Sequence, residues 1–167
     1  MRRIIALLPF TVAACVPAAK PPAPPPPAPV AVAPAPVPTP ALGPDWRDWP
    51  LTPGTWRYAG GVASFGAPGS EPRLTLRCDA GQRRMLLSVA GADPEATIRT
   101  TSTTRRLALQ PAPGAQPSAV ASLSAADPLL DALAFSRGRF TVERPGQPPL
   151  VLPNYAEVGR VIENCRG

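Results

Sequence analysis

The chain has 167 residues and a formal net charge of +6, and it contains no histidine. The missing histidine excludes Ser-His-Asp and Cys-His nucleophiles and removes the commonest transition-metal ligand. Lys20 is the single lysine and lies in a proline-rich stretch, so a Ser-Lys pair is equally improbable. We therefore expect a non-catalytic protein with no cofactor and no metal site.

The first fifteen residues have the pattern of an export signal. Arg2 and Arg3 precede the apolar segment 4–14, which is too short for a transmembrane helix of about 20 residues. The segment ends in Val-Ala-Ala-Cys, with the cysteine at Cys15, and resembles the lipobox of bacterial lipoproteins. The resemblance implies that residues 1–14 form a signal peptide that is removed and that Cys15 receives two or three acyl chains. The alternative is an ordinary cleaved signal.

The residue after the cysteine bears on the membrane that holds the protein. Val16 stands where Gram-negative lipoproteins of the inner membrane carry Asp. The resemblance therefore implies an outer-membrane lipoprotein that faces the periplasm, assuming a Gram-negative cell. Export also separates the chain from nucleic acid, so the basic charge indicates a mixed-charge surface and no nucleic-acid partner.

Residues 15–44 are expected to form a lipidated N-terminus followed by a spacer. Thirteen prolines fall between residues 17 and 44, and most of the other residues there are Ala and Val. Proline lacks an amide donor and fixes φ, so this stretch can form neither a helix nor a central strand. We expect a disordered, semi-rigid linker of polyproline II character that reaches roughly 85 Å when extended.

Residues 45–167 are expected to form a single globular domain made mostly of strands. Alternation of apolar and polar residues predicts a strand at 73–78, and a turn at Gly81-Gln82 joins it to another at 85–89. The glycine-rich stretch 60–66 lacks a phosphate-loop fingerprint. Further strands are expected around 98 and at 107–109, 120–123, 139–143 and 150–152, with 111–117 as a loop.

Two short helices are predicted in the second half of the domain. Asp127-Pro128 has the pattern of an N-cap and first turn, followed by an apolar face that includes Phe135 and ends at Gly138. Asn154 to Glu157 has the pattern of a capping box, and Tyr155, Val158, Ile162 and Cys165 then recur at helical spacing. Capping explains the carboxylates of Asp127 and Glu157 better than catalysis does.

These elements predict an α+β fold, a small antiparallel sheet or sandwich with two short helices. The region Asp127–Arg166 resembles small periplasmic invasion-associated β-sandwich proteins of alphaproteobacteria. The resemblance rests on the order of the elements and implies no functional residue.

The cysteines that remain after Cys15 are Cys78 and Cys165. Both fall on apolar faces, and exported proteins form disulfides. We expect a bridge that joins the last helix to the sheet. The alternative is two separate buried thiols.

Two groups of residues are candidates for a binding surface. The first is aromatic: Trp46, Trp49, Trp56 and Tyr58, of which the last two share one face of a strand. Packing of the entering chain against the core is the alternative. The second is basic: Arg137, Arg139 and Arg144, as an anion site or as a solvated edge.

The sequence thus predicts a membrane-anchored envelope lipoprotein with a non-catalytic binding domain. The expected ligand is cell-wall glycan (peptidoglycan) or a protein partner. The alternative is a structural or assembly factor of an envelope complex with no small-molecule site.

Overall fold

The computed structural model describes residues 42–167. The predicted signal peptide, Cys15 and the spacer up to residue 41 lie outside the described residues. Within residues 42–167 the structure has a short 3-10 helix, η1 (Trp46–Asp48), and two α-helices, α1 (Pro128–Ala134) and α2 (Ala156–Arg166). The ten strands of this described part are β1 (Thr55–Ala59), β2 (Val62–Gly66), β3 (Leu74–Asp79), β4 (Arg84–Ala90), β5 (Glu95–Arg99), β6 (Thr104–Ala108), β7 (Gln110–Ala112), β8 (Ser118–Ser124), β9 (Arg139–Glu143) and β10 (Leu150–Pro153).

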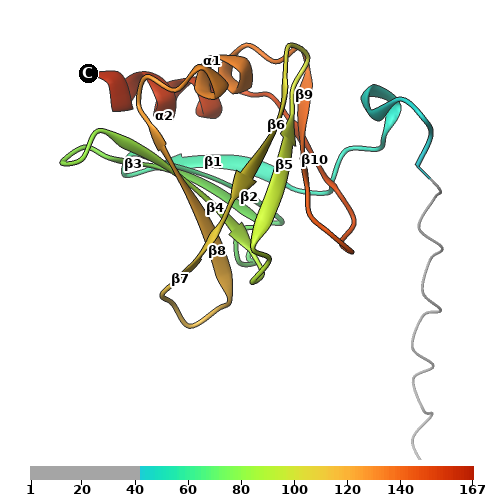
Figure 1. The fold of residues 1–167 in the computed structure, drawn as a ribbon, viewed down its shortest axis with the longest axis horizontal. Coiled ribbons are helices and arrows are strands. Elements are labelled where there is room, and N and C mark those ends of the chain that lie inside the picture. Colours follow the sequence, from blue (N-terminus) through green and yellow to red (C-terminus); the bar gives the residue numbers. More distant parts are fainter. Residues whose placement is uncertain (1–41) are drawn as a thin grey trace, which may run out of the picture. The chain divides into compact units, whose positions relative to one another are not determined.

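The strands form two antiparallel sheets, which confirms the predicted α+β class. The larger sheet has the order β1-β2-β3-β4-β8-β7, and the smaller has the order β10-β9-β5-β6. Both helices lie at one end of the sheets (Figure 1), where α2 packs on β1 to β4 and against α1. Neither helix of the described chain has the length and apolar character needed to cross a membrane.

The core fills the space between the sheets and the helices. Strand alternation places Leu74 and Leu76 of β3 inside, as the sequence predicts, and leaves Arg77 exposed. Met85, Leu87 and Val89 of β4 and Ile98 of β5 join the same buried cluster. Because every second residue of these strands is apolar, burial of one face fixes the register of the sheet.

The hairpin β1–β2 is absent from the prediction. Its two-residue turn is Gly60-Gly61, with φ values of 57° and 77°. Positive φ at both central residues is the requirement of a type I′ turn, which matches the twist of the flanking strands. Gly60 and Gly61 of the glycine-rich stretch therefore form the hairpin turn between β1 and β2.

The first helix begins as predicted and ends earlier than predicted. The Asp127 side chain accepts a hydrogen bond of 2.9 Å from the Leu129 amide, and Pro128 occupies the first turn. The helix ends at Ala134, not at Gly138, because the segment after it bonds to the turn between β5 and β6. Phe135 consequently leaves the apolar face and is 78% exposed.

The predicted capping box of the second helix is wrong. Tyr155 is the N-cap residue, and it makes no side-chain capping bond. Asn154 instead donates from Nδ2 to the carbonyls of Ala134 and Ser136, at 3.0 and 2.6 Å. Tyr155 is exposed, whereas Val158, Ile162 and Cys165 are buried as predicted.

The chain passes from the smaller sheet to the larger one between β6 and β7, close to the start of the loop predicted at 111–117. The strand expected at 107–109 ends at Ala108, and β7 takes up the first residues of the expected loop 111–117. Pro111 lies within β7. The strand tolerates it because β7 is at the edge of its sheet, where a missing amide donor costs little.

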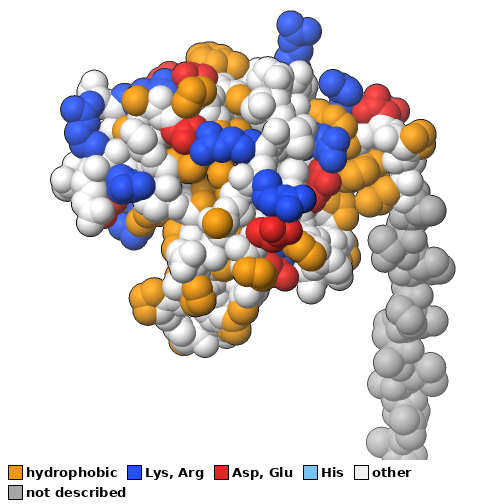
Figure 2. Space-filling view, in the orientation of Figure 1, with side chains coloured by type: hydrophobic (Ala, Val, Ile, Leu, Met, Phe, Trp, Pro, Cys, Tyr) orange, Lys and Arg blue, Asp and Glu red, His pale blue; other side chains and the backbone are white. Residues whose placement is uncertain are grey.

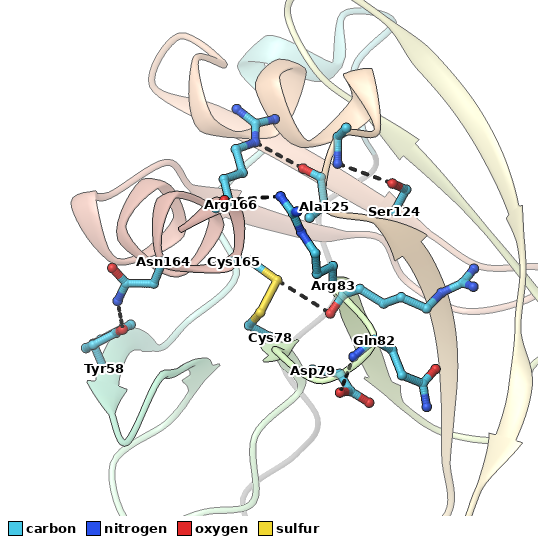
Figure 3. Close-up of a disulfide and its surroundings, with 12 residues drawn as sticks. Tyr58, Cys78, Asp79, Gln82, Arg83, Ser124, Ala125, Asn164, Cys165 and Arg166 are labelled. Atoms are coloured by element: carbon cyan, nitrogen blue, oxygen red, sulfur yellow. Dashed lines mark hydrogen bonds between the residues drawn. A yellow bond between two sulfur atoms is a disulfide. The ribbon is translucent and has the colours of Figure 1, made fainter.

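The predicted disulfide is present (Figure 3). Cys78 of β3 and Cys165 of α2 are bonded, with 5.3 Å between their α-carbons and a sequence separation of 87. Around the bond, Asn164 donates to the Tyr58 hydroxyl at 2.6 Å, and Arg166 donates to the Ala125 carbonyl at 3.0 Å. The last turn of α2 is therefore fastened to the larger sheet.

Candidate functional site

The buried tryptophans do not form a ligand surface. Trp46 and Trp56 are 7% and 5% exposed. Trp56 donates from Nε1 to the Pro153 carbonyl at 2.7 Å, and its ring meets Phe65 edge-on at 5.4 Å. Packing thus accounts for both residues, and the predicted flat aromatic surface for a glycan is wrong.

The other two aromatic residues are also committed to the fold. Trp49 donates from Nε1 to the Gly43 carbonyl at 2.7 Å. Tyr58, which shares its strand face with Trp56 as expected, is half-buried, and the guanidinium of Arg160 lies 5.2 Å from its ring centroid. The four aromatic residues therefore hold the entering chain and α2 in place.

Arg144 does not join the other two predicted arginines. It follows β9, whereas Arg139 is the first residue of that strand. Its side chain is 10% exposed and donates to the Ala90 carbonyl and to the Asp93 carboxylate, the latter at 2.9 Å. The predicted three-arginine site is wrong, because Arg144 is already paired with Asp93 inside the protein.

Arg137 and Arg139 instead meet an arginine that the sequence prediction missed. A hollow of about 670 Å³, called here the arginine hollow, is lined by residues that include Arg47, Arg137 and Arg139, and none of its lining residues is acidic. Arginine and acidic side chains are otherwise interspersed over the face shown in Figure 2. A hollow lined by three arginines and by no acidic residue has the chemistry of an anion site. The Arg47 guanidinium also lies 3.4 Å from the Asp45 carboxylate, but both side chains are about half-exposed, and an exposed pair of this kind is weak.

The aromatic packing explains how Arg47 reaches this place. Buried Trp46 anchors η1, and the Arg47 guanidinium lies 5.1 Å from the Trp46 ring centroid. Arg139 donates to the Trp49 carbonyl at 2.6 Å, which ties the segment after η1 to the start of β9. Asp45 caps η1 through the Arg47 amide, which lowers the pKa of the Asp45 carboxyl.

The remaining wall of the arginine hollow is a pinned turn. Thr100 Oγ1 accepts hydrogen bonds from the amides of Ser102 and Thr103 and so closes the turn between β5 and β6. The Thr101 amide donates to Ser136 Oγ at 3.1 Å, and the Arg137 amide donates to Thr101 Oγ1 at 3.1 Å. These reciprocal bonds fix residues 136–139 against the turn, so the hollow is formed before any ligand arrives.

A second hollow adjoins the first. It has a volume of about 420 Å³ and is called here the apolar hollow, because Pro128, Leu129, Ala132 and Phe135 form much of its wall. Ser102 and Phe135 line both hollows. The two therefore share a border at the exposed Phe135 ring.

Two aspartates near the apolar hollow, Asp127 and Asp131, are paired with arginines. Arg105 holds Asp127 through two hydrogen bonds of 2.6 and 2.9 Å. These bonds, assisted by the Leu129 amide, lower the pKa of the Asp127 carboxyl. Asp131 pairs with Arg166 at 2.6 Å. Within residues 42–167 no group of three or more His, Cys, Asp or Glu side chains is placed to hold a metal ion.

Comparison of the chain with models of protein families, with functionally characterised proteins and with solved structures gives no match. The resemblances drawn from the sequence, to lipoprotein signals and to invasion-associated proteins, stay predictions.

Two residues of the site were missed for different reasons. Arg47 and Arg137 are 90 residues apart in the sequence, and no local pattern links them. Phe135 was assigned to a helix face, although the run of polar and glycine residues directly after it is a signal that the helix ends there.

Proposed function

We propose that this protein is a lipid-anchored envelope lipoprotein whose folded domain binds an anionic ligand, without catalysis, in the arginine hollow. The observation that carries the proposal is the convergence of Arg47, Arg137 and Arg139 on one hollow whose lining includes no acid. Two of the three come from the sequence motif singled out for anion binding, and the third replaces Arg144.

The anchor and the location rest on the sequence. The lipobox-like stretch before Cys15 supports acylation, and Val16 supports the outer membrane of a Gram-negative cell. Two or more acyl chains give stable membrane attachment, whereas one does not. The proline-rich spacer supports a domain held away from the membrane surface, within reach of the cell wall and of other envelope proteins.

The chemistry of the hollow favours carboxylate ligands. Guanidinium groups bind carboxylates through paired, charge-assisted hydrogen bonds. Peptidoglycan carries carboxylates on its peptide stems, and a protein partner presents them on acidic residues or at its C-terminus. The two ligand classes expected from the sequence, cell-wall material and a protein partner, therefore both remain compatible with the site.

Intact-mass measurement tests the anchor. Protein extracted from membranes under non-reducing conditions should have the mass of residues 15–167 plus acyl chains, less two hydrogens for the disulfide. A Cys15→Ala variant should lose the acyl chains. An unacylated protein in the soluble fraction would contradict the anchoring proposal and leave the binding proposal standing.

Calorimetric titration with soluble muropeptides tests the binding site. Arg137→Ala should weaken binding by about tenfold, since hydrogen bonds to charged groups contribute about 1.5–3 kcal/mol. The control is Arg106→Ala, which removes the same charge at a side chain that is 73% exposed and outside the hollow. Equal losses from both variants would contradict the proposed site. Absence of muropeptide binding, with retained capture of an envelope protein, would favour the assembly-factor alternative.

A further inference from the structure

The shared border of the two hollows bears on which ligand the site takes. Phe135 is the most exposed of the large hydrophobic side chains in the described chain. It stands between the arginine hollow and the apolar hollow and lines both. Its backbone is held by a hydrogen bond of 2.9 Å from its amide to the Asp131 carbonyl. A single exposed hydrophobic side chain is ordinary on a protein surface, so the position of Phe135 on the border of two hollows is the informative feature. Aromatic side chains in such positions are frequent anchors of bound partners.

The apolar hollow has little free charge of its own. Arg105 and Asp131 lie at its wall, but Arg105 is paired with Asp127 and Asp131 is paired with Arg166. The rest of the wall is supplied mainly by α1, through Pro128, Leu129 and Ala132. This hollow therefore suits an apolar group, whereas its neighbour suits an anion.

We propose that the two hollows together bind the C-terminal residue of a protein partner, with its free carboxylate among the arginines and its bulky apolar side chain against Phe135. The inference rests on the proposed function, because it uses the same arginine hollow. A C-terminal residue carries its carboxylate and its side chain on one α-carbon, which fits two hollows that share a border. Charge complementarity selects the carboxylate, and the apolar wall selects the side chain.

The pinned turn adds groups that suit a peptide backbone. Thr101 and Ser102 line the arginine hollow and carry hydroxyl groups, which both donate and accept hydrogen bonds. Because the turn is already fixed by Thr100 and Ser136, a peptide bound there does not have to order it.

Three short peptides separate the two halves of the recognition. The first is acetyl-Ala-Ala-Leu with a free carboxylate, the second is the same peptide as its C-terminal amide, and the third is acetyl-Ala-Ala-Ala with a free carboxylate. Binding of each to the whole mature protein is measured by NMR titration. The acid should bind about tenfold more tightly than the amide, and the Leu peptide about fivefold more tightly than the Ala peptide.

Two variants assign each preference to its hollow. Phe135→Ala should remove the preference for Leu over Ala and keep the preference for acid over amide. Arg137→Ala should do the reverse. Both side chains are exposed, so neither change disturbs the core.

The outcomes distinguish this inference from the proposed function. If the Ala acid binds as well as the Leu acid, or if Phe135→Ala leaves the Leu preference unchanged, the inference is overturned and carboxylate binding stands. If acid and amide bind equally, or if none of the peptides binds, the C-terminal carboxylate has no site there and the inference is also overturned. A different result would overturn the proposed function: muropeptides and acidic partners would bind the Arg137→Ala variant with the same affinity as the native protein.

Discussion

Removal of the disulfide should destabilise the domain strongly. The bond between Cys78 and Cys165 closes a loop of 87 residues. For a loop of that length, the reduction in entropy of the unfolded chain corresponds to about 4–5 kcal/mol of stability. A domain of this size loses about 4 °C in Tm for each kcal/mol, so the variant Cys78→Ala/Cys165→Ala should melt about 15–20 °C below the native protein.

Differential scanning calorimetry of the whole mature protein measures this shift, as the change in Tm of the folded domain. Reductant should lower the Tm of the native protein toward that of the double variant and should leave the double variant unchanged, which is the internal control. A double variant that melts within a few degrees of the native protein would show that the hydrogen bonds around α2, and not the closed loop, hold that helix on the sheet.

Three further predictions concern other parts of the fold. The hydrogen bonds from Arg105 are the main reason that the pKa of Asp127 is lowered in the folded protein. The stability that this carboxylate contributes should therefore be complete above the ordinary aspartate pKa of about 3.9 and be lost as the pH falls through the lowered folded pKa. In urea unfolding at a series of acidic pH values, Asp127→Asn should reduce this loss of stability, and an unchanged pH dependence would refute the pairing. Trp56→Phe should cost about 1–3 kcal/mol in urea unfolding, because the Pro153 carbonyl loses a buried donor; an unchanged midpoint would contradict this. Gly60→Ala should destabilise the domain by about 1 kcal/mol because φ is 57°, whereas Gly159→Ala, within α2 and with open space around it, should stabilise it by about 0.5–1 kcal/mol. A raised Tm for the first variant or a lowered Tm for the second would contradict the corresponding prediction.

Local patterns predicted the elements that depend on local chemistry. The alternation around Leu74 and Leu76 located β3, and Asp127-Pro128 located the start of α1, because side-chain period and capping act within a few residues. The disulfide could be predicted because both cysteines fall on apolar faces and because the signal-like N-terminus indicates export. The strand β2 is absent from the prediction because adjacent glycines mark a hairpin only when both adopt positive φ, as Gly60 and Gly61 do in the folded chain.

The parts that depend on distant contacts could not be predicted in this way. The end of α1 is set by bonds from Ser136 and Arg137 to a turn some 35 residues earlier, and Phe135 is exposed as a result. Asn154 was expected to cap the helix after it, but in the folded chain it bonds to carbonyls after α1. The arginine hollow needs η1 beside the start of β9, which no pattern in either segment encodes.

The most direct test of the central claim is an NMR titration that observes the arginine side-chain Nε–Hε groups of the mature protein while acetyl-Ala-Ala-Leu is added. The signals of Arg47, Arg137 and Arg139 should shift together and saturably, along with the amides of residues 101–103, while the signals of Arg106 and Arg144 stay in place. Equal shifts of all arginine signals, or shifts confined to other parts of the domain, would contradict an anion site in the arginine hollow.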